Sequence, residues 1–388
     1  MKSPSVIELS KSALKKNLRF LRKLIGKETI FSSVIKGNAY GHGIEVFVPL
    51  AEACGVRHFS LFDASEALRT LNSRTCKSDI MIMGAIDNDE LEWAIENDIS
   101  FYIFNRDRLI NALDISKRIG KPTRVHLELE TGLNRMGLIE KDLEDVIKII
   151  MDEKEHFKIE GVSTHFAGAE SVNNYLRIQN QIDKFKIMTN NLRRENAGIG
   201  FRHAACSAAV FNYPETIMDM VRVGIAQYGF WPNKETQLRY VLANSNDAMK
   251  KFNDPLKRVL KWKSRIIDVK HVKSGDFIGY GTSYQTSRAQ KIASVPVGYF
   301  HGFSRNLSNY GRVLINGKRV AVVGLVNMNM MMVNVTDVPN VKIGDEVVII
   351  GKQGRMQITI ASFSDMTDNL NYEVLVSLQP DIPRIVVD

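Results

Sequence analysis

Cysteine is scarce in this sequence, and the few cysteines form no recognisable pattern. Cys54, Cys76 and Cys206 are the only three among 388 residues. Their number is odd, their spacing is wide and no C-x-x-C occurs, so neither a disulfide framework nor a zinc site is indicated. Because free thiols persist in a reducing compartment, we expect a cytoplasmic protein that holds no metal.

Long apolar runs and basic runs are lacking as well. No stretch approaches the roughly 18 uninterrupted apolar residues that a membrane helix needs, and no apolar run follows Lys2 at the N-terminus. We therefore expect neither a membrane-spanning segment nor a secretory signal. The net charge is +9, but the lysines are dispersed along helical patterns without interleaved aromatic residues. This distribution favours a solvated surface over a nucleic-acid site.

The first two-thirds of the chain alternates short β-branched or aromatic runs with amphipathic helical patterns. Apolar residues make up 44% and charged residues 24%, which is typical of a globular protein with a full core. Eight strand-like runs occur, at residues 30–36, 57–62, 80–83, 100–104, 124–130, 158–165, 200–205 and 220–223. Eight strands separated by helices over roughly 230 residues predict an α/β fold of the (β/α)8 TIM-barrel type. A doubly wound open sheet is the alternative.

The character of the sequence changes after Trp231-Pro232. Residues 234–256 are polar, and from residue 257 many short strand-like runs alternate with turn signals. Asn316-Gly317 separates two such runs, and this dipeptide favours a two-residue hairpin because both turn positions need positive φ. We therefore expect a barrel over residues 1–233, a linker or insertion over 234–256, and a C-terminal all-β domain over 257–388.

Residues with useful chemistry gather where the predicted barrel strands end, which is where barrel active sites lie. They are Lys36, Glu130, Arg135, His165, Ser207 and the run Arg222 to Ile225. Lys36 ends a β-branched run amid apolar neighbours, where desolvation favours the neutral amine. A neutral amine can form a Schiff base with an aldehyde cofactor. From its position alone, an ordinary surface lysine is the alternative.

Several motifs follow one another along nearly the whole chain in an order that resembles one enzyme family. They are residues 33–43 around Lys36, Glu130-Thr131-Gly132-Leu133-Asn134-Arg135, Ser163-Thr164-His165-Phe166, His203-Ala204-Ala205-Cys206-Ser207, Arg222-Val223-Gly224-Ile225, Gly279-Tyr280-Gly281-Thr282, Pro296-Val297-Gly298-Tyr299 and Asn371-Tyr372-Glu373-Val374. The chain resembles the alanine racemases, a two-domain family with a barrel that binds pyridoxal 5'-phosphate and a β-rich C-terminal domain.

The resemblance implies interconversion of L- and D-amino acids, with alanine as the expected substrate. Lys36 would carry the cofactor and act as one acid/base group, and Tyr280 would be the other, on the opposite face. Racemisation needs two such groups, because a proton leaves one face of the α-carbon and arrives at the other. In this family Tyr280 and the 324–330 loop enter the active site of the neighbouring subunit, which implies a homodimer with active sites at the subunit interface.

The resemblance assigns further residues to the cofactor and the substrate. The expected cofactor-binding residues are Lys36, Tyr40, Arg135, His165, Ser207, Arg222, Gly224, Ile225 and Tyr372. The expected substrate-binding residues are Arg135, Tyr299 and Met328. Arg222 would face the pyridine nitrogen, and since arginine stays protonated it would not donate a full proton to the ring. That choice weakens the cofactor as an electron sink and disfavours side reactions.

Three departures from the family pattern leave alternatives open. Glu128 stands where the family often has a lysine that becomes carbamylated, and we expect it to pair with Arg135. Asn327 and Asn329 replace a cysteine and an aspartate of the family, so a racemase of broader specificity, or one for serine or lysine, is the alternative. Residues 234–256 are longer than the usual linker. A decarboxylase of the same barrel type, or a non-catalytic cofactor-binding protein, fits the motifs less well.

Overall fold

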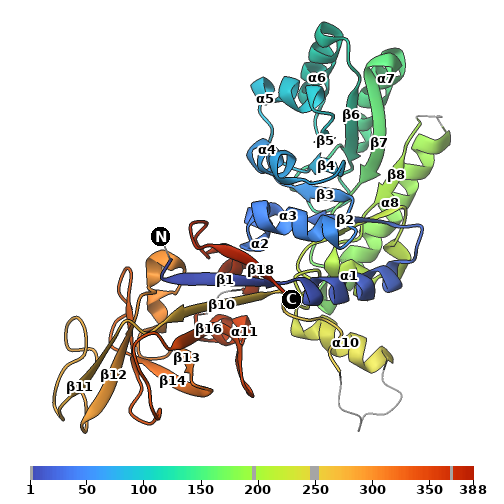
Figure 1. Cartoon of the computed structure of the whole chain (residues 1–388). Helices are drawn as coiled ribbons and strands as arrows, with labels where there is room; N and C mark the ends of the chain where they lie inside the picture. The colour runs from blue at the N-terminus through green and yellow to red at the C-terminus, as the bar shows by residue number, and fades with distance from the viewer. Residues whose placement is uncertain (1–2, 195–197, 245–252, 368–369) are drawn as a thin grey trace. The chain divides into compact units, whose positions relative to one another are not determined.

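The computed structural model describes the whole chain except residues 1–2, 195–197, 245–252 and 368–369 (Figure 1). Contacts divide the chain into two compact units. The barrel unit comprises Ala13–Lys36 and Val48–Lys257, and the sheet unit comprises Met1–Ser12, Gly37–Phe47 and Arg258–Asp388. Each unit has its own sheet and its own apolar core.

The barrel unit contains eight parallel strands in the order β8-β7-β6-β5-β4-β3-β2-β9. Their bounds are β2 (Ile30–Val34), β3 (His58–Leu61), β4 (Asp79–Ile82), β5 (Ser100–Ile103), β6 (Thr123–Glu128), β7 (Phe157–Ser163), β8 (Phe201–His203) and β9 (Met220–Val223). A single bridge between Cys206 and Arg222 joins β8 to β9, with Arg222 N–H donating to Ala205 O at 2.9 Å. The sheet therefore nearly closes, which confirms the predicted barrel over the open sheet.

Helices precede, connect or follow the barrel strands. They are α1 (Lys11–Ile25), α3 (Ile44–Ala53), α4 (Ala64–Ser73), α5 (Asn88–Glu96), α6 (Arg106–Ile119), α7 (Glu140–Asp152), α8 (Tyr175–Arg194), α9 (Ser207–Asn212) and α10 (Lys234–Asn244). In α1 the residues at three- and four-residue spacing, Leu14, Leu18, Leu21 and Ile25, are buried. Side-chain caps fix two starts: Asp63 accepts from Glu66 N–H and Asn105 from Arg108 N–H.

The sheet unit has ten strands, with the path β11-β12-β15-β14-β13-β16-β10-β1-β18 and with β17 paired to β16. Their bounds are β1 (Ser5–Ser10), β10 (Leu260–Arg265), β11 (Asp268–Val272), β12 (Gln290–Val295), β13 (Arg312–Ile315), β14 (Lys318–Val323), β15 (Met331–Asn334), β16 (Glu346–Gln353), β17 (Met356–Ile358) and β18 (Arg384–Val387). Asn316 and Gly317 turn the β13–β14 hairpin at φ 50° and 75°, and Ile315 pairs with Lys318. The predicted hairpin is confirmed.

The two compact units differ from the expected domains in two of their boundaries and in the secondary structure of the C-terminal part. β1 pairs antiparallel with β10 and parallel with β18, because its alternating buried residues fit a one-sided sheet, so the N-terminus lies with the sheet unit. Residues 37–47 also group with the sheet unit. The C-terminal part, expected to be all-β, also contains α11 (Ile360–Thr367) and α12 (Asn371–Val376). Of the expected linker 234–256, α10 is helical and residues 245–252 lie outside the described residues.

Candidate active site

Lys36 follows β2 directly and is succeeded by a left-handed turn. Gly37, Asn38, Ala39 and Tyr40 have φ of 63°, 54°, 54° and 51°. Four consecutive left-handed residues are unfavourable for L-amino acids, which visit this region as single residues. Gly41 N–H closes the turn by donating to Gly37 O at 3.0 Å. Backbone strain of this kind is concentrated at functional sites in proteins.

The charges around Lys36 favour its neutral amine. Its side chain reaches solvent, yet enough protein surrounds it that burial lowers the pKa of Lys36 below the usual lysine value. The positive charge of Arg135 lowers this pKa further, the negative charge of Glu66 opposes it with a smaller effect, and Arg222 adds a weaker lowering effect. Two guanidinium groups therefore act on the Lys36 amine at the carboxyl ends of the barrel strands, and their positive charge suits an anionic ligand.

The loop that carries Arg135 is held rigid by its own backbone. Leu138 N–H donates to Glu128 O at 2.7 Å, and Glu130 N–H donates to Leu138 O at 3.0 Å. The buried carboxylate of Glu130 accepts from the N–H groups of Gly132 and of Asn134, the latter at 2.9 Å. The loop thus presents Arg135 on an exposed tip while its base stays fixed.

The expected pairing of Glu128 with Arg135 is wrong for this structure. Among the described residues no carboxylate lies within hydrogen-bonding distance of Arg135. Glu128 is 3% exposed, and its Oε2 has no hydrogen-bond partner in the described part of the chain. Burial raises the pKa of Glu128, against the lowering effects of Arg222 and Arg135. Glu128 is buried at the end of β6, whereas Arg135 is exposed on the loop that follows.

Arg222 is fixed in place, whereas His165 is neutral. The Arg222 guanidinium is 4% exposed and donates to Thr164 O at 2.7 Å, to His203 O at 2.6 Å and to His203 Nδ1 at 2.7 Å. Burial first, and then the positive charges of Arg222, Arg135 and Lys36, lower the pKa of His165 to about 3. The imidazole of His165 therefore remains neutral above that pH and can accept a hydrogen bond.

A small set of hydrogen-bonding groups lies where β8 and β9 close the barrel: Ser207, Gly224 and Ile225. Ser207 begins α9, and its Oγ accepts from Gly224 N–H at 3.0 Å. Among the described residues no acceptor lies within hydrogen-bonding distance of Ile225 N–H. A hydroxyl group beside free and exchangeable backbone N–H groups is suited to a phosphate. The structure thus brings together three residues that the sequence motifs assign to one task.

In the sheet unit the structure forms two further pairs of predicted residues. The rings of Tyr40 and Tyr372 lie 5.9 Å apart between centroids. Tyr299 N–H donates to Asn327 O at 3.1 Å, and Phe300 N–H donates to Met328 O at 2.9 Å, so the loops bearing Tyr299 and Met328 lie side by side. A β-carbon on the adjacent Gly298 would overlap both carbonyls.

Tyr280 lies on an exposed loop of the sheet unit. Its side chain is 70% exposed, and the residue is flanked by Gly279 and Gly281 at φ 77° and 65°. The loop is closed by Ile278 N–H donating to Tyr284 O at 3.0 Å. A tyrosine held outward in this way is available to another surface.

Gln181 is a supporting residue that the sequence analysis missed. Within α8 it is 1% exposed, and its amide accepts from Ala167 N–H at 2.8 Å and donates to His165 O at 3.0 Å and to Thr131 Oγ1 at 3.3 Å. It thereby joins the His165 segment to the loop that carries Arg135. The signal in the sequence was a glutamine on the apolar face of α8, beside Ile178 and Ile182.

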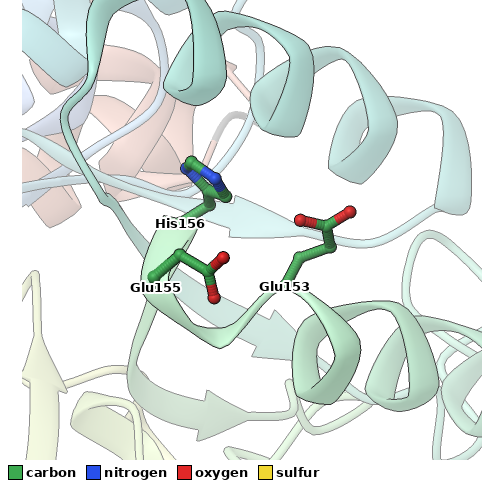
Figure 2. A group of neighbouring side chains, drawn as sticks. All are labelled: Glu153, Glu155 and His156. Atoms are coloured by element: carbon green, nitrogen blue, oxygen red, sulfur yellow. The ribbon is translucent and has the colours of Figure 1, made fainter.

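A second cluster of titratable groups lies away from these residues. Glu153, Glu155 and His156 gather at the end of α7 (Figure 2). Lys117 Nζ lies 2.5 Å from Glu153 Oε1, and Ser116 Oγ lies 3.2 Å from His156 Nδ1. Because protein groups partner the cluster, we interpret it as a solvated ion-pair network.

Comparison with known proteins identifies the family. The model of the alanine racemase N-terminal domain matches residues 9–232, and that of the alanine racemase C-terminal domain matches residues 259–386. The chain belongs to the alanine racemase family. It is an amino acid racemase, an isomerase, with the barrel and the separate antiparallel sheet domain of that family.

Similar racemases span the whole chain. An alanine racemase of Leptospira interrogans is 35% identical over 385 residues, covering 99% of this chain and 96% of that protein. One of Methanococcus maripaludis is 32% identical and covers 98% of each chain. A solved alanine racemase of Clostridium difficile superposes with a TM-score of 0.88 at 28% identity, covering 100% of this racemase and 96% of that chain.

The structure of alanine racemase from Bacillus anthracis with bound L-Ala-P superposes equally well. Its TM-score is 0.88 at 27% identity, and the match covers 100% of this racemase and 96% of that chain. Among the described residues of this racemase, no helix combines the length and apolar character needed to cross a bilayer.

Proposed function

We propose that this racemase interconverts L- and D-alanine with pyridoxal 5'-phosphate held by Lys36. The observation that carries the proposal is the position of Lys36 at the carboxyl end of β2, before a left-handed turn, where burial and the charges of Arg135 and Arg222 lower its pKa. A lysine that binds an aldehyde must lose its proton first, and these surroundings favour that loss. We also propose that it supplies D-alanine in the cytoplasm. The free thiols of Cys54, Cys76 and Cys206 support that location.

The residues present fit such a cofactor. Ser207 Oγ and the N–H groups of Gly224 and Ile225 offer the neutral donors that a phosphate needs, and Tyr40 and Tyr372 bring two hydroxyl-bearing rings together in the sheet unit. Arg135 would bind the phenolate and the substrate carboxylate, for which a guanidinium fork is suited. When bound, the cofactor supplies a conjugated ring that delocalises the electron pair left at the α-carbon.

Lys36 and Tyr280 would move the proton. In one direction the neutral amine of Lys36 would accept the α-proton on one face and the phenol of Tyr280 would donate a proton on the other. In the reverse direction the phenolate of Tyr280 would accept and the protonated amine of Lys36 would donate. Because Tyr280 is 70% exposed in its own chain, we assign it to the active site of a partner subunit in a homodimer. Tyr299 and Met328, which lie on adjacent loops and are also exposed, would accompany it and contact the substrate.

His165 and Arg222 would set the electrostatics of the site. With a pKa of about 3, His165 is a neutral hydrogen-bond acceptor, suited to orient the phenol of Tyr280. Arg222 would hold the ring nitrogen with a guanidinium that keeps its proton. Its four hydrogen bonds to Thr164, His203 and Ala204 leave it little freedom to move, which supports a fixed positive charge at this place.

Alanine is the substrate that the names of the relatives support. Asn327 and Asn329 lie on the loop beside Tyr299, and the side-chain oxygen of Asn327 is buried without a partner in the described part of the chain. These two positions are where a preference for a larger or more polar side chain would arise.

A panel of amino acids incubated with the purified enzyme in deuterated water tests the proposal. We expect alanine to exchange its α-proton and lose optical rotation fastest. Tyr280→Phe is expected to abolish interconversion of the enantiomers and to confine α-proton exchange to the one enantiomer whose proton faces Lys36, while the protein keeps its yellow colour. A colourless native protein would refute the role of Lys36. Unchanged racemisation in the Tyr280→Phe variant would refute the two-base assignment.

A further inference from the structure

The interior of the barrel holds a chain of buried histidines that begins at Arg222. His203 ends β8 and His126 lies on β6, and their side chains are 0% and 1% exposed. His203 Nε2 lies 2.9 Å from His126 Nδ1, and the two rings meet edge to face with centroids 5.0 Å apart. Arg222 Nη1 lies 2.7 Å from His203 Nδ1 at the other side of the ring.

Arg222 determines which ring nitrogens carry protons. A guanidinium has donors only, so His203 Nδ1 must accept from it. In a neutral His203 the proton then resides on Nε2, which donates to His126 Nδ1. A neutral His126 in turn carries its proton on Nε2. The N–H dipoles of both rings therefore point away from the guanidinium, which is the favourable orientation next to a positive charge in a low-dielectric interior.

The barrel backbone is built to allow this chain. Gly161 on β7 pairs with His126 in register, and a β-carbon at Gly161 would lie 2.9 Å from His126 Nδ1 and 3.2 Å from His203 Nε2. A larger residue would therefore displace the hydrogen bond between the two rings. Burial, followed by the positive charge of Arg222 for His203 and by neighbouring His58 for His126, lowers the pKa of both histidines well below the usual value.

His126, at the end of the histidine chain that is farther from Arg222, borders a cavity. His126 lines a cavity of about 700 Å³ at the amino-terminal ends of the strands, together with His58, Asp79, Arg124, Lys158 and Glu160. His126 therefore borders a space that is lined by charged residues as well as by apolar ones such as Ile30 and Phe31. Among the described residues no carboxylate lies within ion-pair distance of Arg222, so carbonyl groups and this dipole chain balance its charge.

We propose that His126 is a positioning residue for Arg222: it accepts the Nε2–H of His203 and so keeps Nδ1 of His203 available to the guanidinium. If His126 were apolar, the Nε2–H of His203 would have no acceptor. The ring of His203 could then rotate or change tautomer, and Arg222 would lose one of its fixed contacts. The kinetic consequence of this inference rests on the proposed function, whereas the tautomers do not.

Nitrogen-15 NMR of the cofactor-free protein labelled only at histidine tests the tautomers directly. We expect the shifts of His126 and His203 at pH 7 to show neutral rings, each protonated at Nε2, with assignment by the His126→Asn variant. A protonated ring, or a proton on Nδ1 of His203, would overturn the proposal. This result does not depend on any activity, so a wild type that racemises nothing would refute the proposed function alone.

A matched pair of variants tests the positioning role. Asparagine and leucine have the same branching, but only the asparagine Oδ1 can accept the Nε2–H of His203. We expect His126→Leu to lower kcat about tenfold with little change in KM, because one buried hydrogen bond is lost. His126→Asn should keep a kcat near that of the wild type. His58→Leu alters the lining of the same cavity, but His58 is not one of the two hydrogen-bonded histidines, so this variant should leave kcat unchanged. Equal losses of kcat in the Asn and Leu variants would overturn the proposal. If His126→Leu does not fold, the NMR shifts decide whether His126 accepts the Nε2–H of His203.

Discussion

The hydroxyl oxygens of Thr131 and Thr164 lie 2.7 Å apart, and both side chains are buried. This contact joins the loop that carries Arg135 to the end of β7, one residue before His165. Gln181 donates to the same Thr131 hydroxyl and to His165 O. Three segments that present functional side chains are therefore linked through side-chain hydrogen bonds below the exposed surface.

Replacing Gln181 should disturb activity without touching a reacting group. In Gln181→Leu the N–H of Ala167 and the carbonyl of His165 lose their buried partners, which costs about 1–3 kcal/mol of stability. We expect a lower melting temperature and a decrease of about tenfold in the rate of α-proton exchange. Gln179→Leu, two residues earlier on α8, is the control and should leave both quantities unchanged. Normal exchange in Gln181→Leu would contradict the linkage.

Ser207 should contribute measurably to cofactor affinity. Its hydroxyl is the side-chain donor nearest to the N–H groups of Gly224 and Ile225, and a hydrogen bond to a charged phosphate contributes about 1.5–3 kcal/mol. Ser207→Ala is therefore expected to raise the Kd for pyridoxal 5'-phosphate about tenfold or more, measured by absorbance titration of the cofactor-free enzyme. Cys206→Ala, at the adjacent position, should leave the Kd unchanged. An unaltered Kd in Ser207→Ala would remove Ser207 from the phosphate site.

Gly41 should tolerate no side chain. It has φ of 74°, and a β-carbon there would overlap the carbonyl oxygen of Leu375. Gly120, which caps α6 at φ 67°, has no atom within 4 Å of such a carbon. We expect Gly120→Ala to cost about 1 kcal/mol from the backbone conformation alone. Gly41→Ala should cost roughly 3 kcal/mol, since overlap adds to strain. Similar melting temperatures for the two variants would be evidence against the close approach.

The buried histidines should make the protein sensitive to acid. Burial, the largest cause in each case, lowers the pKa of His42 and of His58 to about 4 and that of His165 to about 3. Below the ordinary value of 6.5 the unfolded chain binds protons that the folded chain refuses, so the free energy of unfolding falls as the pH falls from 6.5 toward 4. Each such histidine contributes a slope of about 1.4 kcal/mol per pH unit.

Chemical denaturation between pH 4.5 and 8 measures that slope. His58→Gln removes one titrating group and should make the decline below pH 6 shallower by about 1.4 kcal/mol per pH unit. His271 is exposed on β11, so His271→Gln should keep the wild-type slope. If the His58→Gln variant declines as steeply as the wild type, His58 is not the neutral buried group described above.

Periodicity and turn chemistry were sufficient to predict most of the fold. The eight barrel strands and the Asn316-Gly317 hairpin occur where β-branched runs and the turn dipeptide predicted them. β1 was missed because its partners, β10 and β18, lie more than 200 residues away in the sequence, and local pattern carries no information about such pairing. The grouping of residues 37–47 with the sheet unit was missed for the same reason.

The candidate site was predictable where a motif fixes a backbone position and less so where side chains must reach one another. Ser207 and Gly224, both assigned to the cofactor by the resemblance, lie within hydrogen-bonding distance of each other. The expected pairing of Glu128 with Arg135 does not form, because Glu128 is buried at the end of β6 while Arg135 is exposed on the following loop. Gln181 and His126 received no attention in the sequence because a buried polar residue looks like any other until its partners are known.

A single bridge, between Cys206 and Arg222, is the backbone pairing that joins β8 to β9 among the described residues, and side chains supply the other bonds across this junction, such as Arg202 with Asp219. Ser207 lies just beyond one edge of this seam and Gly224 just beyond the other, joined by one hydrogen bond. A phosphate bound by both residues would link the ends of β8 and β9. Amide hydrogen exchange along β8 and β9 should accordingly slow when the cofactor phosphate binds, so that cofactor binding would also stabilise the closure of the barrel.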